Sequence, residues 1–425
     1  MFRLLRRGDT GPLVEYLQST LNKLGFNVGE VDGVFGDRTY NAVLRFQRTM
    51  GLTQDGIVGP ATWQALMPYM QGYIKYTIRS GDTFYRLAQE YNTSINAIQA
   101  ANPGLDPLNL QVGTQITLPV SSVTIPTNIS YSYDIMMFNI ESLLVRFPFL
   151  RRQNIGSSVL GNNLVCIQMG TGPKEVSYNA SHHGNEWITT VVLMKFIEQF
   201  CNAYVNGGTI AGESAQEIFN TCSIYLVPMV NPDGVNLVTG WYDEDSEPYK
   251  SARALNQGGR FPEDWSANIV GVDLNNNYPA EWEEARRIKF ALGYTSPRQS
   301  QYVGPYPLSE PETQAMAAFT QAHNFRLILA YHSQGELIYW QFLNYNPPNS
   351  REIADAFARV SGYSVEQTPL NSAYAGYKDW FIQENNLPGY TIEVGLGRNP
   401  LPISQFNRIY NDNVGILVLG AVLAN

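Results

Sequence analysis

Histidine is rare in this sequence, which narrows the search for residues that could do chemistry. The four histidines among 425 residues fall in three places, His182-His183, His323 and His332. His183 and Glu186 stand three residues apart, where an apolar strand expected over 175–180 gives way to a helix, so both side chains can reach one point. His332 directly follows another expected strand, over 327–331, and therefore also lies at a strand end.

These residue types favour zinc. Catalytic zinc takes three protein ligands and keeps a fourth position for water, and two histidines with one glutamate are a set that it commonly uses. We therefore expect His183, Glu186 and His332 to bind one zinc ion per chain. The alternative is that these histidines are structural, because a histidine three residues before a glutamate occurs by chance in many chains.

Five short motifs between residues 130 and 425 favour the zinc interpretation. They are His183-Gly184-Asn185-Glu186, Asn231-Pro232-Asp233-Gly234, Asp273-Leu274-Asn275-Asn276-Asn277, His332-Ser333 and Thr391-Ile392-Glu393-Val394. Their order and spacing resemble the zinc carboxypeptidase (carboxypeptidase A-like) family over nearly all of this part of the chain. The resemblance implies that Glu393 is the general base, which takes a proton from the zinc-bound water and delivers it to the leaving amine.

The chemistry expected of Glu393 is reasonable on physical grounds. A carboxylate at the end of a buried apolar strand is costly unless it has a partner or a task. Zinc lowers the pKa of its bound water to about 7, within reach of a carboxylate base. The alternative is that Glu393 is structural and forms an ion pair with a nearby Lys or Arg.

One position departs from the family's pattern. The exopeptidases of the family have an arginine that binds the substrate's terminal carboxylate through two hydrogen bonds, and Asn276 stands in its place. An amide cannot form that charged pair, which argues against ordinary trimming of C-terminal residues.

A subgroup of the family accounts for this departure. The stretch 271–280 and the stretch 375–381 look like the γ-D-glutamyl-meso-diaminopimelate peptidases, which cut bacterial stem peptides. The resemblance places Asn275, Asn276 and Tyr374 among the substrate-binding residues.

Two further roles transfer less directly. The family's electrophilic arginine should lie between Gly234 and Asp273, where Arg253 and Arg260 are the candidates, and we favour Arg253. For the family's mobile tyrosine, Tyr374 and Tyr377 are equal candidates, and ordinary core packing is a further alternative for both.

The elements expected to position these residues form an α/β fold. Short apolar runs at 164–169, 175–180, 224–229, 327–331 and 390–394 alternate with amphipathic helices such as 191–200. This alternation predicts a mixed, mostly parallel sheet with flanking helices, as in carboxypeptidases. Ligands collect at the carboxyl ends of the strands in such sheets.

The first seventy residues contain an internal repeat. Asp32-Gly33-Val34-Phe35-Gly36 returns 23 residues later as Asp55-Gly56-Ile57-Val58-Gly59, and each copy precedes a helix start. With the helix expected around residues 13–24, three short helices follow. The pattern, including Phe46-Gln47, resembles the three-helix peptidoglycan-binding domain, and a helical cap that binds nothing is the alternative.

Residues 74–119 have a different pattern. A β run at 76–78, two helices and a final run at 116–119 resemble the LysM module, a β-α-α-β unit that binds N-acetylglucosamine chains. Ser, Thr and Pro then dominate 121–130, as in a linker. We expect an all-α peptidoglycan-binding domain at 1–72, an α+β LysM domain at 73–120, a linker at 121–131 and a zinc peptidase domain at 132–425.

Composition excludes other classes of protein. Apolar residues make up 44% and charged residues 15%, as in globular proteins, and the net charge of −9 does not suit nucleic acid. No run approaches eighteen apolar residues, so no membrane span is expected. Cys166, Cys201 and Cys222 lie in apolar runs and should be free buried thiols, although pairing of Cys201 with Cys222 stays open.

These observations lead to a ranked set of functions. The first is a zinc metallopeptidase that hydrolyses the γ-D-glutamyl-meso-diaminopimelate bond, with peptidoglycan glycan chains and stem peptides as partners. The second is a conventional zinc carboxypeptidase, and the third is an inactive wall-binding protein. We expect association with the cell wall or spore. The N-terminus as written lacks the apolar run of a signal peptide, so cytoplasmic synthesis, for example in a sporulating mother cell, is compatible with access by another route.

Overall fold

The structure is a computed structural model that describes residues 2–121 and 123–424. It divides into two compact units. The first takes in the chain up to Ser130 together with Asp134–Leu150 and Glu198–Gly208. The second comprises Tyr131–Tyr133, Arg151–Ile197 and the chain from Thr209 onward. Over the described ranges, no helix is both long and apolar enough to cross a membrane.

The first unit begins with three helices, α1 (Pro12–Lys23), α2 (Asp37–Thr49) and α3 (Pro60–Gln71). Gln18 of α1 is buried and organises the first Asp-Gly turn. Its Nε2 donates to Asp32 Oδ1 at 2.8 Å and to Thr39 Oγ1 at 3.0 Å, and its Oε1 accepts the N–H of Gly33 at 2.9 Å. One side chain therefore ties helix α1 to the turn and to the first residues of α2.

Gln47 of α2 repeats this arrangement one copy later. Its Nε2 donates to Asp55 Oδ1 at 2.8 Å and to Thr62 Oγ1 at 3.1 Å, and its Oε1 accepts the N–H of Gly56 at 3.0 Å. The repeat in the sequence thus corresponds to two copies of one turn held by a buried glutamine.

The next element group has the predicted β-α-α-β order. Strands β1 (Tyr73–Thr77) and β2 (Gln115–Pro119) pair antiparallel, and the chain between them forms α4 (Phe84–Glu90) and α5 (Ile95–Ala101). The side chains of Thr83 and Ser94 cap the two helices by accepting backbone N–H groups, as their residue types favour. The described part of the predicted linker has no helix or strand, and α6 (Tyr133–Arg146) follows it.

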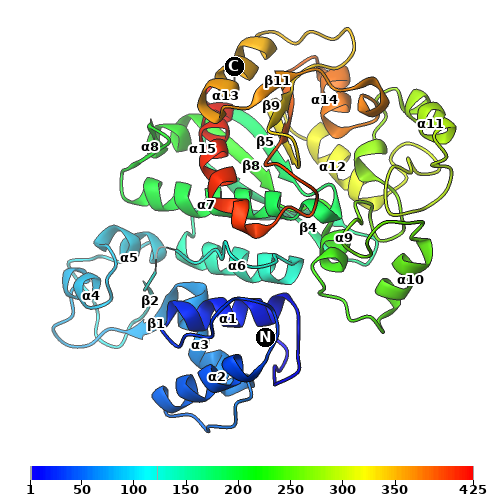
Figure 1. Cartoon of the computed structure of the whole chain (residues 1–425). Coiled ribbons are helices and arrows are strands. Elements are labelled where there is room, and N and C mark those ends of the chain that lie inside the picture. The colour runs from blue at the N-terminus through cyan, green and yellow to red at the C-terminus, as the bar shows by residue number, and fades with distance from the viewer. Residues whose placement is uncertain (1, 122, 425) are drawn as a thin grey trace. The chain divides into compact units, whose positions relative to one another are not determined.

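The second unit is built on an eight-stranded sheet, with strand order β11-β10-β12-β9-β5-β8-β4-β3 (Figure 1). Four of its seven neighbouring pairs are parallel, including the central run β12-β9-β5-β8. The predicted mixed, mostly parallel sheet is therefore confirmed. The strands are β3 (Arg151–Ser157), β4 (Asn163–Met169), β5 (Lys174–Ala180), β8 (Cys222–Val227), β9 (Phe325–His332), β10 (Leu337–Tyr339), β11 (Ser364–Glu366) and β12 (Gly389–Glu393).

One predicted strand was shifted. The apolar run was expected to continue as strand to Met229, but β8 ends at Val227. The next residue is Pro228, which has no N–H to donate to a neighbouring strand, so the pairing ends before it. Three strands of this sheet, β3 and the short strands β10 and β11, were not predicted.

Helices cover both faces of the sheet. Figure 1 places α13 (Ser350–Ser361) and α15 (Phe406–Val422) on one side, and α12 (Pro311–Gln321) and α14 (Tyr377–Asn385) on the other. The remaining helices and short paired strands are α7 (Ile188–Val205), β6 (Thr209–Ile210), β7 (Glu213–Ser214), α8 (Ala215–Thr221), α9 (Pro232–Val238), α10 (Glu247–Leu255) and α11 (Trp282–Ala291). Cys166, Cys201 and Cys222 are buried and free, as predicted.

Candidate metal centre and active site

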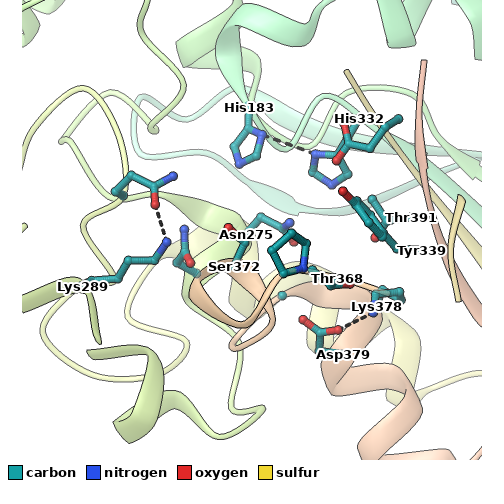
Figure 2. Close-up of a pocket in the computed structure, with 15 residues that line it drawn as sticks. His183, Asn275, Lys289, His332, Tyr339, Thr368, Ser372, Lys378, Asp379 and Thr391 are labelled. Atoms are coloured by element: carbon teal, nitrogen blue, oxygen red, sulfur yellow. Dashed lines mark hydrogen bonds and ion pairs between the residues drawn. The ribbon is translucent and has the colours of Figure 1, made fainter. Parts of the chain in front are cut away.

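The parallel strands bring the predicted zinc ligands together at one edge of the sheet. His183 follows β5 and stands just before a short 3₁₀ turn, Gly184–Glu186, which ends at Glu186, while His332 is the last residue of β9. His183 Nδ1 lies 3.0 Å from Glu186 Oε1, His332 Nδ1 lies 3.0 Å from Glu186 Oε2, and the two Nδ1 atoms are 3.3 Å apart. Figure 2 shows both imidazoles close together among the residues that line one pocket.

These distances suit a shared cation. Ligands of tetrahedral zinc, at about 2.0–2.1 Å from the metal, lie about 3.3 Å from one another. A neutral imidazole whose Nε2 holds the proton offers a lone pair at Nδ1, and a carboxylate offers lone pairs only. In that tautomer none of the facing nitrogen and oxygen atoms carries a hydrogen, so they cannot hydrogen-bond to one another. One metal ion can accept a lone pair from each of the three groups. Among the described residues, His183, Glu186 and His332 form the one group of His, Cys, Asp or Glu close enough to hold a metal ion.

A buried carboxylate orients His183. The Nε2 atom of His183 lies 3.2 Å from Asp273 Oδ1, and Asp273 Oδ2 accepts the backbone N–H of Gln301 at 2.9 Å. A histidine that donates its far N–H to a carboxylate presents its other nitrogen to a metal in a fixed direction. Asp273, the first residue of the Asp-x-Asn motif, therefore supports the metal site without being a ligand.

The electrostatics of the cluster are strongly coupled. Burial raises the pKa of Glu186, but in the absence of a metal ion its electrostatic interactions and hydrogen bonds with His183 and His332 outweigh burial and bring that pKa to about 2. Burial also raises the pKa of Asp273, and His183 again reverses the effect, leaving the pKa well below its ordinary value. Glu186 and Asp273 are therefore ionised, and their negative charge favours the binding of a cation.

Two glycines fix the position of the metal-ligand turn. A Cβ atom on Gly184 would lie 2.7 Å from the backbone carbon and oxygen of Gly234, and one on Gly234 would lie 2.7 Å from the carbonyl oxygen of Ala267 and from the side-chain amide of Asn231, so neither position has room for a side chain. Asn231 strengthens this junction, since its Nδ2 donates to the carbonyl of His182 at 3.1 Å and its Oδ1 accepts the N–H of Gly234 at 3.0 Å. The Asn-Pro-Asp-Gly motif therefore acts as a support for the turn that contains His183 and Glu186.

Glu393 ends strand β12 and is paired in register with His332 on the parallel strand β9. It lines the same pocket as both histidines. Burial, followed by the nearby charge of Glu186, raises the pKa of Glu393 well above its ordinary value. A dication between His183, Glu186 and His332 would oppose both effects, because positive charge favours the ionised carboxylate.

The pocket extends from the metal centre as a mostly polar cavity of about 230 Å³. Asn275 and Asn276 both line it, from the 3₁₀ turn Leu274–Asn276. The Oδ1 atom of Asn275 accepts the N–H of Tyr377 at 3.0 Å, so that side chain also anchors the start of α14. The lining residues beyond the predicted set are Lys289, Gln301, Tyr339, Thr368, Pro369, Ser372, Gly376, Lys378, Asp379 and Thr391.

The arginine candidates lie in different surroundings. Arg253 is exposed on α10 and does not line the pocket. Arg260 pairs with Asp264 at 3.1 Å, and its Nη2 donates to the carbonyl of Asn399 at 3.4 Å. Asn399 Nδ2 in turn lies 3.4 Å from Glu186 Oε1, so Arg260 is linked to the metal centre and Arg253 is not. The role given to Arg253 remains a prediction.

The tyrosine candidates are placed as packing residues. Tyr374 is partly buried and packs against a cluster that includes Trp282, Val303 and Ala375. Tyr377 is fully buried, and its hydroxyl lies 2.9 Å from Thr320 Oγ1. Neither tyrosine lines the pocket, whereas Tyr339 does. The substrate-binding role of Tyr374 remains a prediction.

Comparison with known proteins agrees with this geometry. A family model described as zinc carboxypeptidase matches residues 139–415, and the chain therefore belongs to the zinc carboxypeptidase family. Models described as putative peptidoglycan binding domain and LysM domain match residues 10–66 and 76–119. The chain is thus a zinc metallopeptidase of this family with two wall-binding modules before its catalytic part.

Two relatives show which kind of protein within the zinc carboxypeptidase family this chain resembles. The chain is 44% identical over 296 residues to gamma-D-glutamyl-L-diamino acid endopeptidase 1 of Lysinibacillus sphaericus, covering 69% of this chain and 73% of that protein. It is 38% identical over 280 residues to the uncharacterized protein YqgT of Bacillus subtilis, covering 65% and 73%.

Solved structures share the fold at low identity. Bovine thrombin-activatable fibrinolysis inhibitor, in complex with tick carboxypeptidase inhibitor, aligns with a TM-score of 0.53 at 18% identity, over 69% of this chain and 97% of that one. Carboxypeptidase A from Helicoverpa armigera aligns with a TM-score of 0.52 at 19% identity, over 70% and 74%. These likenesses establish the carboxypeptidase-like fold of the second unit.

Proposed function

We propose that this chain hydrolyses the amide bond between γ-D-glutamate and meso-diaminopimelate in the stem peptides of bacterial peptidoglycan. The observation that supports this most is that two members of the His183, Glu186 and His332 cluster, the two histidines, line one polar pocket. Glu393 lines the same pocket, and so does Asn276, which stands in the place of the family's arginine. A relative with 44% identity bears the name of a γ-D-glutamyl-L-diamino acid endopeptidase. The two wall-binding modules point to the same substrate without sharing any residue with the pocket.

Each residue at the site has a separate role in the proposed hydrolysis. His183, Glu186 and His332 would hold one zinc ion per chain, with Asp273 keeping His183 in the tautomer that binds metal. Bound zinc supplies Lewis acidity, which polarises a carbonyl and lowers the pKa of water to about 7. Glu393 accepts a proton from the attacking water and delivers it to the nitrogen of the leaving diaminopimelate. Asn275 and Asn276 bind the substrate through uncharged amide groups.

The N-terminal part of the chain serves to hold the enzyme on its substrate. We assign residues 1–72 and 73–120 to peptidoglycan-binding and LysM domains, 121–131 to a linker and 132–425 to the peptidase domain. The family matches at 10–66 and 76–119 support the binding of glycan chains and a location at the cell wall. Tethering raises the local concentration of stem peptides around the catalytic pocket.

The product of the reaction tests the proposal. The purified protein should convert L-Ala-γ-D-Glu-diaminopimelate to L-Ala-D-Glu and free diaminopimelate, identified by mass spectrometry. The Glu393→Gln variant is the matched control, because it keeps the shape of the pocket but cannot accept a proton. A matching peptide with an α-linked D-Glu should stay intact. Efficient removal of an apolar C-terminal residue from a blocked dipeptide would instead establish a conventional carboxypeptidase.

A further inference from the structure

A buried ion pair lines the pocket that extends from the metal centre. Lys378 and Asp379 are neighbours on α14, and each is 3% exposed. Lys378 Nζ lies 2.5 Å from Asp379 Oδ1, and Figure 2 shows the two side chains together. Taking two charges out of water costs free energy that their attraction often fails to recover, and apolar residues of similar size would serve stability as well. A buried pair in the wall of a substrate pocket therefore calls for a role in binding.

Both members of the pair can bind a further group. The Nζ atom of Lys378 carries three hydrogens, and it contacts two groups among the described residues, Asp379 and the carbonyl of Gln341 at 2.8 Å. The carboxylate of Asp379 accepts from Lys378 and from the backbone N–H of Gly376, and a carboxylate has about four acceptor positions. Burial raises the pKa of Asp379 and Lys378 opposes that rise, so a second cation beside Asp379 would favour its ionised form further.

The strands place this pair at some distance from the metal centre. His332 is in register with Glu393, and Thr391, two residues earlier on β12, is in register with Tyr339 on β10. Two residues of a strand span about 7 Å. In Figure 2, Thr391 and Tyr339 lie between His332 and Lys378. The pocket therefore has the metal centre at one end and the ion pair farther along it.

This pocket suits the residue whose nitrogen leaves. Asn276 lines it and stands where the family's exopeptidases have the arginine that binds a terminal carboxylate. That carboxylate is on the carbon that bears the scissile nitrogen. With the scissile carbonyl at the metal centre, the side chain of the leaving residue would extend into the pocket, and a long side chain would bring its far end to Lys378 and Asp379.

The far end of meso-diaminopimelate has the matching chemistry. Three methylene groups separate the carbon that bears the scissile nitrogen from a second carbon, and this second carbon bears both a carboxylate and an ammonium group. With the carboxylate at Lys378 and the ammonium group at Asp379, four charges alternate in sign. Each new contact is a charge-assisted hydrogen bond between groups that are shielded from water, where such bonds are strong.

We propose that Lys378 and Asp379 bind the distal end of the leaving diamino acid, Lys378 through the carboxylate and Asp379 through the ammonium group. The inference rests on the proposed function and assigns the residues that select the leaving group. The pair is neutral overall, so a leaving residue with only one of the two distal charges would repel one member of the pair as it binds the other. A leaving residue with neither charge would lack both contacts.

Four tripeptides isolate the two contacts. Each is L-Ala-γ-D-Glu-X, with X linked through the α-nitrogen of its L-centre. Meso-diaminopimelate has both distal groups, L-lysine has only the ammonium group, L-2-aminopimelate has only the carboxylate, and L-norleucine has neither. The same number of carbons leads to the distal position in all four, so the reach of the side chain does not vary.

Binding and turnover are measured separately. Dissociation constants come from calorimetry with the zinc-loaded Glu393→Gln variant, which binds without turnover, and kcat/KM comes from the zinc-loaded chain with Glu393 intact. Lys378→Met, Asp379→Asn and the double variant are compared in both. Lys250→Met is the matched control, because Lys250 is an exposed lysine of α10 outside the pocket. Zinc content and melting temperature are recorded for every protein.

The expected result is a change in selectivity. The unaltered pocket should bind the diaminopimelate peptide about 10- to 100-fold more tightly than a peptide that lacks either distal group. Lys378→Met should remove the difference between the diaminopimelate and lysine peptides, and Asp379→Asn should remove the difference between the diaminopimelate and 2-aminopimelate peptides. The double variant, which leaves neither charge of the pair without its partner, should bind the norleucine peptide at least as well as the diaminopimelate peptide. Lys250→Met should keep the original order.

Other outcomes would overturn the proposal. Equal weakening of all four peptides in the variants would show that the pair only supports α14. Equal binding of all four peptides by the unaltered pocket would show that the pair does not contact the leaving residue. Failure of the zinc-loaded wild type to cleave the diaminopimelate peptide would contradict the proposed function, whereas cleavage without the expected selectivity would contradict only the role of Lys378 and Asp379.

Discussion

His332 and Glu393 are register partners at the ends of two neighbouring parallel strands, β9 and β12. Adjacent strands lie about 4.8 Å apart, so the backbone fixes the separation between a metal ligand and the proposed base. Because each residue ends its own strand, either side chain can be altered while the other keeps its position. This relationship makes the roles of the two residues separable by experiment.

The first prediction concerns the metal. His332→Ala should hold far less than one zinc per chain after dialysis, and a chelator should abolish activity of the wild type, because three ligands define a catalytic zinc site. His323→Ala is the matched control, since His323 pairs with Glu175, outside the cluster. Metal analysis by atomic emission checks both variants. Full zinc occupancy in His332→Ala would show that the ligand set is wrong.

The second prediction concerns the base. Glu393→Gln should bind zinc as the wild type does and lose about 10²- to 10⁴-fold in kcat, because the amide cannot accept a proton. Steady-state rates on the stem tripeptide, normalised to zinc content, measure this loss. Turnover within a few-fold of wild type would exclude Glu393 as general base.

The third prediction separates the two arginines. Arg260 is linked through Asn399 to Glu186, whereas Arg253 is exposed on α10. If an arginine supports the oxyanion, Arg260→Met should lower kcat by about 10²-fold, as removal of an oxyanion donor does, and Arg253→Met should change it less than two-fold. The reverse result would restore Arg253, the residue favoured by the sequence.

The fourth prediction concerns the missing arginine. Asn276 is buried, so a guanidinium placed there is costly unless the substrate supplies a carboxylate. Asn276→Arg should therefore raise the ratio of kcat/KM on peptides with a free C-terminal carboxylate to that on amidated ones by several-fold. The same ratio in wild type is the reference. An unchanged ratio would mean that position 276 does not face the substrate's carboxylate.

The fifth prediction concerns stability and pH. Glu312 is fully buried, and burial, with Asp233 and Glu310 nearby, raises its pKa from 4.5 to about 7. The folded state therefore holds a proton that the unfolded state releases, so the stabilising contribution is complete below about pH 4.5 and is lost as the pH rises through about 7. The loss is at most about 3.5 kcal/mol, since one pKa unit corresponds to about 1.4 kcal/mol.

Replacement by a neutral side chain reveals this contribution. Glu312→Gln should gain stability relative to wild type as the pH rises from about 4.5 to about 7.5, measured by urea unfolding. Glu283→Gln, on the exposed face of α11, should leave the pH dependence as it is in wild type. A constant difference between wild type and Glu312→Gln over this range would contradict the prediction.

The sequence predicted that His183, Glu186 and His332 would lie close together, and this grouping depends on local signals that the sequence shows directly. Strand β9 is a nearly continuous apolar run that ends at His332, β12 ends at Glu393, and β5 is followed three residues later by His183. The repeated Asp-Gly turns were equally visible, although the buried glutamines that hold them were not assigned that role.

The walls of the pocket could not be predicted in the same way. Tyr339 lies on β10, a three-residue strand too short for a periodic signal, while Thr368 lies in irregular chain and Ser372 ends a short 3₁₀ turn, Leu370–Ser372. Lys289 stands in a helix rich in Glu and Arg, a composition typical of an exposed surface, yet it is buried. Only the packing of α11 on the rest of the domain distinguishes it from its charged neighbours.

The contact between Gly184 and Gly234 has a consequence for how this enzyme can change. Since neither turn admits a Cβ atom, the chain segment with His183 and Glu186 cannot be shifted without moving the Asn231–Gly234 segment with it. The segment 368–372, which lines another wall of the pocket and ends in a short 3₁₀ turn, contains no glycine. Libraries that vary residues 368–372 and leave both glycines unchanged should give variants that have new substrate preferences and still bind zinc. Natural selection can change substrate preference through the same segment.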